Sequence, residues 1–165
     1  MHFPLFPHYK VDSVTDISPQ ALVQKGIRLL MLDFDNTIVP YTSNEPTDRM
    51  VQWLRDIVAS EIDVCVVSNS KRDRVKHFCE AYGLGCITAA QKPFPKGIKE
   101  CLSQYDYDPA HCALAGDQIY TDILGANCCG VKSILVRAIH NHIFLLKTRH
   151  IVELPWIWLA GKRGF

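Results

Sequence analysis

Two aspartates, Asp33 and Asp35, directly follow the apolar run at residues 27–32. The run predicts a buried strand, and residues two apart on a strand point to the same side of the sheet. Two carboxylates at one strand end repel each other by roughly 4 kcal/mol at ~4 Å and an effective dielectric of ~20. A hard cation such as Mg²⁺, which prefers oxygen ligands, would compensate that repulsion. The pair therefore points to metal-assisted chemistry on an anion.

The elements that must position this pair alternate between strands and helices. Short apolar runs predict strands at residues 27–33, 64–67, 86–88, 112–115 and 133–136. Apolar residues at helical spacing, together with capping and stop signals, predict helices at residues 19–25, 46–60, 71–82, 96–105 and 120–127. Such alternation implies a parallel sheet with helices on both faces. We expect an α/β protein with a three-layer α/β/α Rossmann-like fold.

Further polar side chains follow the other predicted strands: Ser68, Lys92, Asp117 and Asp122. Each has an ordinary explanation when taken alone. Ser68 and Asp117 could cap helices, and Lys92 could be a solvated loop lysine, with Lys96 as a competitor for any role. In a parallel sheet, however, the carboxyl ends of the strands share one edge, where ligands bind. Their shared location is therefore stronger evidence than any one residue.

Four sequence pieces together resemble the haloacid dehalogenase (HAD) superfamily of phosphohydrolases. They are DFDNT at 33–37, VVSNS at 66–70, QKP at 91–93 and GDQIYTD at 116–122. The resemblance covers about residues 27–137 and rests on the order, spacing and strand placement of all four pieces. It implies that Asp33 is a nucleophile that forms an aspartyl-phosphate. It also implies that Asp35 acts first as general acid and then as general base.

The same resemblance implies the rest of the site. Mg²⁺ would lie between the Asp33 carboxylate, the backbone carbonyl of Asp35 and Asp117. Ser68 and Lys92 would contact the phosphoryl oxygens, and Asp122 would orient Lys92 or a metal-bound water. The implied substrate-binding residues are Asn36, Thr37, Ser68, Asn69 and Lys92.

The arrangement of the two acids and the length of the chain between the motifs distinguish this family from a similar one and indicate which kind of HAD protein this is. A response-regulator receiver domain also groups acids, a hydroxyl and a lysine around Mg²⁺, but there the acid pair and the phosphorylated aspartate lie on different strands. Here both acids follow one strand, which favours the hydrolase. Only about 32 residues separate Asp35 from Ser68, and a helix uses many of them. We therefore expect a HAD fold with no substantial cap domain and an open site.

In more detail, the chain resembles the class IIIA branch and, within it, the phosphatidylglycerophosphate phosphatase subfamily. The residues that carry this are DFDNTIVPY at 33–41, VSNS with the basic segment at 71–75, and GDQIYTDILGAN at 116–127. The resemblance implies hydrolysis of phosphatidylglycerophosphate to phosphatidylglycerol. Two alternatives stay open: a phosphatase of a soluble phosphorylated metabolite or nucleotide, and a non-catalytic phospho-binding module.

The chain divides into an N-terminal arm with a short helix (1–26), a phosphatase core (27–139) and a C-terminal tail (140–165). The tail combines Trp156 and Trp158 with four basic residues, the composition of an interfacial segment that meets anionic lipid. Packing on the core or a dimer contact is the alternative. The subfamily resemblance implies a membrane lipid as the phosphorylated substrate, while the tail leaves peripheral membrane contact and packing on the core or a second subunit both open. The oligomeric state also stays open.

Composition restricts the remaining function classes. The 165 residues carry a net charge of +1, which gives no basic field for a nucleic-acid partner. The seven cysteines form no CxxC motif and are expected to be buried free thiols. No apolar run approaches the ~18 residues of a membrane span, and the first residues do not resemble a signal peptide. We expect a cytoplasmic protein with peripheral contact at the inner face of the membrane.

Overall fold

The computed structural model describes residues 4–43, 45–71 and 73–139. Within these residues the centre is a six-stranded sheet in which every neighbouring pair is parallel. Its strands are β1 (Tyr9–Val11), β2 (Leu29–Leu32), β3 (Asp63–Val67), β4 (Gly85–Ile87), β5 (Cys112–Gly116) and β6 (Lys132–Val136). The order across the sheet is β1-β6-β5-β2-β3-β4.

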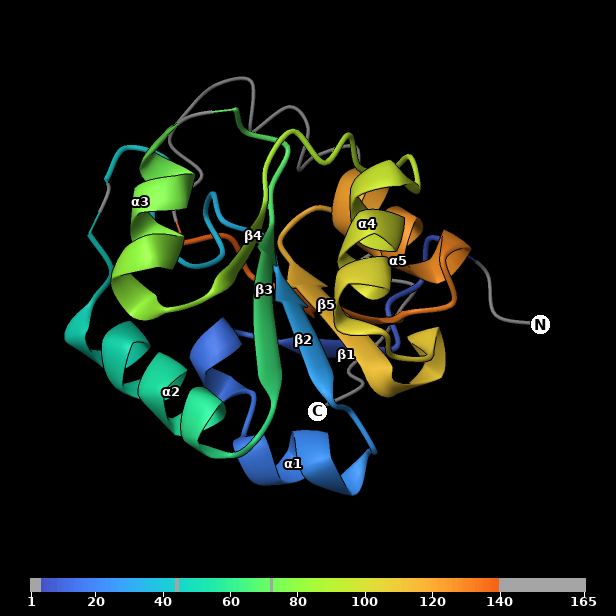
Figure 1. The fold of residues 1–165 in the computed structure, drawn as a ribbon, viewed down its shortest axis with the longest axis horizontal. Helices are drawn as coiled ribbons and strands as arrows, with labels where there is room; N and C mark the ends of the chain where they lie inside the picture. The colour runs from blue at the N-terminus through green and yellow to red at the C-terminus, as the bar shows by residue number, and fades with distance from the viewer. Residues whose placement is uncertain (1–3, 44, 72, 140–165) are drawn as a thin grey trace.

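Helices cover both faces of this sheet. They are α1 (Pro19–Gln24), α2 (Asp48–Ala59), α3 (Asp73–Tyr82), α4 (Lys96–Tyr105) and α5 (Leu124–Cys128), with a π-helical turn at Ile119–Ile123 and 3₁₀ turns at Val14–Asp16 and Pro109–His111. Helices α2 and α3 lie on one side of the sheet, and α4 and α5 lie on the other (Figure 1). The expected three-layer α/β/α architecture is confirmed.

The strand alternation explains the two faces. Leu30 and Leu32 of β2 belong to an apolar cluster that contains Leu54 of α2 and Phe78 of α3. Leu29 and Met31, one residue out of phase, belong to a second cluster that includes Ile98 of α4. All four β2 residues are buried, as expected for a parallel strand that is covered on both sides.

Strand β2 lies where the strand order reverses. The chain passes from β2 to β3 and β4 on one side, then returns through α4 to β5 and β6 on the other. A crevice opens at the carboxyl ends of the strands on either side of such a switch point. The fold therefore places the residue that follows β2, Asp33, where ligands bind in this class of protein.

Sequence patterns gave no sign of β1, which extends the sheet into the segment expected to be an irregular arm. Tyr9 pairs with Ile134 of β6, and the His8 N–H donates to the Ser133 carbonyl at 3.0 Å. A three-residue edge strand is too short to show alternation, so only the tertiary contact with β6 defines it. Residue 26 as a boundary stays a prediction, and the tail at 140–165 lies outside the described residues.

No helix among the described residues has the length and apolar composition needed to cross a bilayer. All seven cysteines are free thiols, and Cys65, Cys79, Cys101 and Cys112 are buried.

Candidate active site

Asp33 and Lys92 form the centre of the site. The Asp33 N–H donates to the Ala115 carbonyl at 2.9 Å, which fixes Asp33 at the end of β2 beside β5. Lys92 reaches in from the loop after β4, and its Nζ lies 2.7 Å from Asp33 Oδ1 and 2.7 Å from Asp122 Oδ1. All three side chains are buried. Of the two lysines that sequence patterns left in competition, Lys92 is the one that enters this cluster.

Two further contacts hold Lys92 in place. The Asn69 side chain donates to the Lys92 carbonyl at 2.9 Å and accepts from the Lys92 N–H at 2.7 Å. Burial by itself would lower the pKa of Lys92, but the carboxylates of Asp122 and Asp33 more than reverse this and raise it above its usual range. Lys92 therefore supplies a fixed positive charge beside Asp33.

Asp122 lies in the π-helical turn and is packed against the end of β5. Its Oδ2 accepts the Gln118 N–H at 3.1 Å, and its Oδ1 faces Lys92. A Cβ at Gly116 would lie 2.3 Å from Asp122 Oδ2, so only glycine leaves room for the carboxylate there. This close approach is a physical reason for the glycine of the GDQIYTD segment.

We expect Gly116→Ala to displace the Asp122 carboxylate and, through it, Lys92. The steric conflict should destabilise the protein by about 1–3 kcal/mol. Turnover with Mg²⁺ should fall by roughly 10² because an error of about 1 Å in the position of a charged group has effects of this size. Steady-state kinetics and thermal unfolding measure the two effects. Wild-type turnover in this variant would show that Asp122 does not position Lys92.

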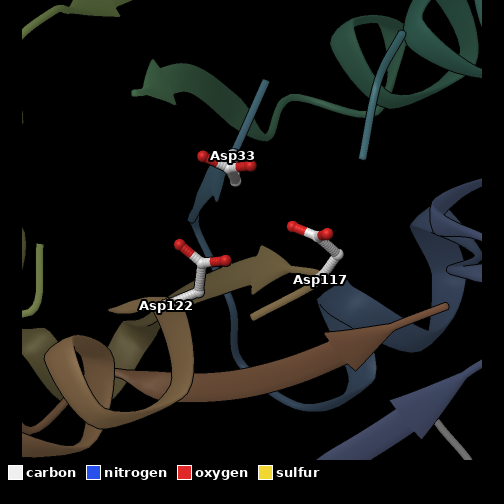
Figure 2. A group of neighbouring side chains, drawn as sticks. All are labelled: Asp33, Asp117 and Asp122. Atoms are coloured by element: carbon white, nitrogen blue, oxygen red, sulfur yellow. The ribbon is translucent and has the colours of Figure 1, made fainter. Parts of the chain in front are cut away.

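Asp33, Asp117 and Asp122 offer carboxylate oxygens that all lie within 4.8 Å of one another. Figure 2 shows the three side chains converging from the end of β2, the end of β5 and the turn that follows. Three carboxylates and one ammonium leave two negative charges, which a divalent cation would balance. The donors are hard oxygens, as Mg²⁺ prefers. The site therefore fits a divalent metal, with Asp33 and Asp117 as the expected side-chain ligands and Asp122 shared with Lys92.

The protonation of Asp33 should govern metal affinity. Burial raises its pKa to about 6, although Lys92 opposes the shift. Above that pH the carboxylate is ionised and can bind metal, and below it a proton competes. We expect Mg²⁺ affinity, measured from the thermal shift of the metal-free protein, to weaken by up to roughly tenfold per pH unit below about pH 6. Equal affinity at pH 7 and pH 5 would contradict this assignment.

Asp35 lies outside this cluster, in an ion pair with Arg74 of α3. Arg74 also donates to the carbonyls of Tyr41 at 3.2 Å and Ser43 at 2.9 Å, and its guanidinium carbon lies 5.1 Å from the centre of the Phe34 ring. The two carboxylates of the opening motif thus have separate partners, Lys92 and Arg74. The sequence analysis expected a metal ion alone to balance the negative charge of Asp33 and Asp35. In the structure, Lys92 and Arg74 balance part of this charge.

The predicted phosphate-binding residues differ in their contacts, and among them Lys92 forms an ion pair with Asp33. Ser68 is buried at the end of β3, and its Oγ accepts the Ser70 N–H at 3.1 Å. The Asn36 side chain accepts the Tyr41 N–H at 3.1 Å, so it shapes its own loop. Thr37 is buried, and within the described residues its Oγ1 has no hydrogen-bond partner. The substrate contacts of Asn36, Thr37, Ser68, Asn69 and Lys92 stay predictions.

Comparisons with known proteins agree with this geometry. A family model described as HAD-hydrolase-like matches residues 89–138, the segment that holds Lys92, Asp117 and Asp122. The probable phosphatase YqeG of Bacillus subtilis is 32% identical over 130 residues, which cover 79% of this chain and 76% of the relative. This chain belongs to the HAD hydrolase family. The glyceraldehyde 3-phosphate phosphatase of Pyrococcus abyssi is 30% identical over 63 residues, 38% of this chain and 26% of that protein.

Solved structures show the same fold. The cobalt-bound deoxy-D-mannose-octulosonate 8-phosphate phosphatase of Haemophilus influenzae superposes with a TM-score of 0.57 at 15% identity, covering 78% of this chain and 89% of that chain. The corresponding phosphatase of Moraxella catarrhalis, solved with magnesium and phosphate ions, gives 0.52 at 14% identity, with 81% and 90% covered. These structures confirm the expected HAD fold, and the phosphatase activity is supported by the family model and the YqeG relative.

Sequence patterns missed Arg74 as part of this HAD site. They marked the segment 71–75 as basic without indicating which residue turns inward. Arg74 precedes Phe78 by one helical turn, and Phe78 packs edge-on against Phe34 at 5.3 Å between ring centres. That i, i+4 spacing places Arg74 on the face of α3 that meets the DFDNT loop. The spacing of Arg74 and Phe78 could therefore have indicated that Arg74 faces the site.

Arg74 also lines a groove of about 290 Å³ beside α3. The other lining residues are Glu45, Pro46, His77, Phe78, Ala81 and Tyr82. Arg74 is thus the residue shared by this groove and the ion pair with Asp35, while Asp35 itself does not line the groove. Sequence patterns indicated no such pocket.

Proposed function

We propose that this HAD phosphatase removes the phosphate from phosphatidylglycerophosphate, giving phosphatidylglycerol, at a membrane surface. The observation that carries this proposal is that the described residues between the site motifs include no cap domain. Between Asp35 and Asp117 the described chain forms α2, β3, α3, β4, α4, the 3₁₀ turn at Pro109–His111 and β5, and no cap domain is inserted among them. An open site can reach a phosphate held at a surface, whereas a free metabolite is better served by a site that closes and excludes water.

In the proposed reaction a carboxylate oxygen of Asp33 attacks phosphorus, and the bond from phosphorus to the ester oxygen breaks. To act as the acid, Asp35 must be protonated and no longer paired with Arg74; it then gives this proton to the departing alkoxide, which leaves as the alcohol of phosphatidylglycerol. Asp35 then takes a proton from water, whose oxygen attacks the aspartyl-phosphate. The bond from phosphorus to Asp33 breaks, inorganic phosphate leaves and the Asp33 carboxylate is restored.

Charge around the phosphoryl group supports both steps. Lys92 is held beside Asp33 by Asp122 and by the loop contact with Asn69, so its ammonium needs no reorganisation during the reaction. Ser68 lies at the adjacent strand end as a hydroxyl donor. Mg²⁺, when bound by Asp33 and Asp117 with the Asp35 carbonyl, supplies a Lewis acid that polarises a phosphoryl oxygen.

A second candidate is hydrolysis of a soluble phosphomonoester with a small leaving group. The groove beside α3 favours it, since about 290 Å³ lies near the lower end of small-ligand sites and its wall offers the aromatic rings of Phe78 and Tyr82. This candidate uses the same catalytic residues, so the site itself does not separate the two.

A substrate panel separates them. Phosphatidylglycerophosphate in mixed vesicles, glycerol 3-phosphate, sugar phosphates, nucleotides and p-nitrophenyl phosphate would be compared at equal Mg²⁺. We expect kcat/KM for the lipid to exceed that for each soluble alkyl phosphate by at least about 10², because remote contacts raise transition-state binding. A soluble ester that matches or exceeds the lipid would favour the second candidate.

A further inference from the structure

Three exposed apolar side chains surround the mouth of the site. Phe94 is 70% exposed, Ile139 40% and Tyr41 37%. They lie in the segments that follow β4, β6 and β2, and parallel strands direct all three segments to the same edge of the sheet. From β6 to β4 this edge spans four strand intervals, or about 19 Å. The apolar residues therefore flank the site on both sides.

The other two large apolar residues that are exposed among the described ones lie at the opposite edge. Val23 is 55% exposed in α1, which directly precedes β2, and Val58 is 50% exposed near the end of α2, which precedes β3. Helix α1 occupies the bottom of Figure 1, away from the loops that follow the strands at the top. These two valines provide controls of similar exposure far from the site.

The chain enters its C-terminal segment at this same mouth. The Ile139 N–H donates to the Asn36 carbonyl at 3.0 Å, which ties the last described residue to the DFDNT loop. Residues 140–165 follow immediately and contain Trp156 and Trp158, with four lysine or arginine residues and one glutamate. A segment of interfacial composition therefore follows Ile139 in the sequence.

Exposed lysines accompany the apolar residues. Lys71 follows β3, and Lys96 opens α4 directly after the Phe94 loop. A lysine close to an anionic bilayer is attracted to it, and an aromatic side chain that leaves water strengthens the binding further. Apolar side chains with basic neighbours are the combination that binds anionic lipid surfaces.

We propose that Tyr41, Phe94 and Ile139, with Lys71 and Lys96, form an active-site rim that docks on an anionic lipid bilayer, so that the site opens onto the membrane. This inference rests on the proposed function, since it explains how Asp33 would reach a phosphate on a lipid headgroup. Docking would also bring the bilayer over the open edge of the sheet and limit the access of bulk water to the site. No cap domain would then be needed.

The test uses the full chain and vesicles of phosphatidylcholine with or without phosphatidylglycerol. Sedimentation measures binding, and turnover is measured on phosphatidylglycerophosphate in the same vesicles and on p-nitrophenyl phosphate in solution. The variants are Phe94→Ser, Lys71→Gln and Lys96→Gln. The matched controls are Val23→Ser, Val58→Ser and Arg55→Gln, an exposed arginine on α2.

We expect Phe94→Ser to weaken binding to anionic vesicles roughly tenfold or more, and each lysine variant to weaken it about fivefold in a salt-sensitive way. Lipid turnover should fall in parallel. Turnover of p-nitrophenyl phosphate should stay within about twofold of wild type, because the rim acts in docking, and a side chain this exposed contributes little to stability. The controls should bind like wild type.

Several outcomes would overturn the docking role. They are wild-type vesicle binding by Phe94→Ser, equally weakened binding by the valine controls, and a fall in p-nitrophenyl phosphate turnover as large as the fall in lipid turnover. If the wild-type protein dimerised with rising concentration and Phe94→Ser abolished this dimerisation, the rim would instead be a contact between two copies of the chain. If the rim variants bound vesicles more weakly but neither the variants nor wild type hydrolysed the lipid, the docking role would be kept and the lipid substrate rejected. If the rim variants hydrolysed the lipid as fast as wild type, the lipid substrate would be kept and the docking role of the rim rejected.

Discussion

Asp33→Asn should lower kcat by on the order of 10⁴-fold or more at saturating Mg²⁺. The amide keeps the size of the side chain but cannot attack phosphorus, and removal of a nucleophile has effects of this scale. It also removes one expected metal ligand from the group of Asp33, Asp117 and Asp122. Turnover of p-nitrophenyl phosphate gives the rate, and acid quenching with labelled substrate should trap a phosphoenzyme in wild type only.

Stability measurements distinguish this loss from misfolding. Asp33 is buried, and burial raises its pKa to about 6, so its charge at neutral pH opposes folding when no metal is bound. Metal-free Asp33→Asn should therefore unfold at or above the wild-type temperature, with a smaller gain on adding Mg²⁺. Asp56→Asn, at an exposed position on α2, is the matched control and should retain wild-type turnover. Equal turnover by Asp33→Asn and wild type would favour the non-catalytic phospho-binding alternative.

Topology explains why much of the site was predictable from the sequence. Each polar residue follows an apolar run, and a parallel sheet brings the ends of all such runs to one edge. Asp33, Ser68 and Asp117 follow β2, β3 and β5, which are adjacent in the sheet. Strand order alone therefore brings these three residues together.

No local pattern links the charge partners, because Lys92 meets Asp33 across 59 positions of sequence and Arg74 meets Asp35 across 39. The family resemblance implied that Lys92 brings a positive charge to this site and that Asp122 orients it, and the structure brings these three side chains together. The pairing of Asp35 with Arg74 was not predicted. Asp122 was expected within or beside an ordinary helix at 120–127, but the structure has a π-helical turn there. Such turns depend on tertiary packing and are frequent at functional sites. This turn lets Asp122 bind the Gln118 N–H and Lys92 at once.

Lys92→Met should have the second largest effect and should affect both activity and stability. Methionine has similar length but no charge, so the developing charge on the phosphoryl oxygens loses its fixed cation, and kcat should fall by about 10²–10³. Asp33 and Asp122 would also lose the ammonium that lies 2.7 Å from each. Breaking a buried ion pair by removing one partner costs about 3–5 kcal/mol. Lys96→Met, at an exposed position four residues later, should change neither the stability nor the turnover of p-nitrophenyl phosphate, the soluble substrate used for this comparison.

A double variant separates the two effects of Lys92. In Lys92→Met with Asp122→Asn the uncompensated carboxylate is removed, so the free energy of unfolding should recover by more than the two single changes predict, whereas kcat should stay low. Mg²⁺ should stabilise Lys92→Met more than wild type, because the cation balances charge that Lys92 no longer balances. Calorimetry with and without Mg²⁺ measures both. If Lys92→Met and Lys96→Met gave the same kcat, Lys92 would have only a structural role between Asp33 and Asp122.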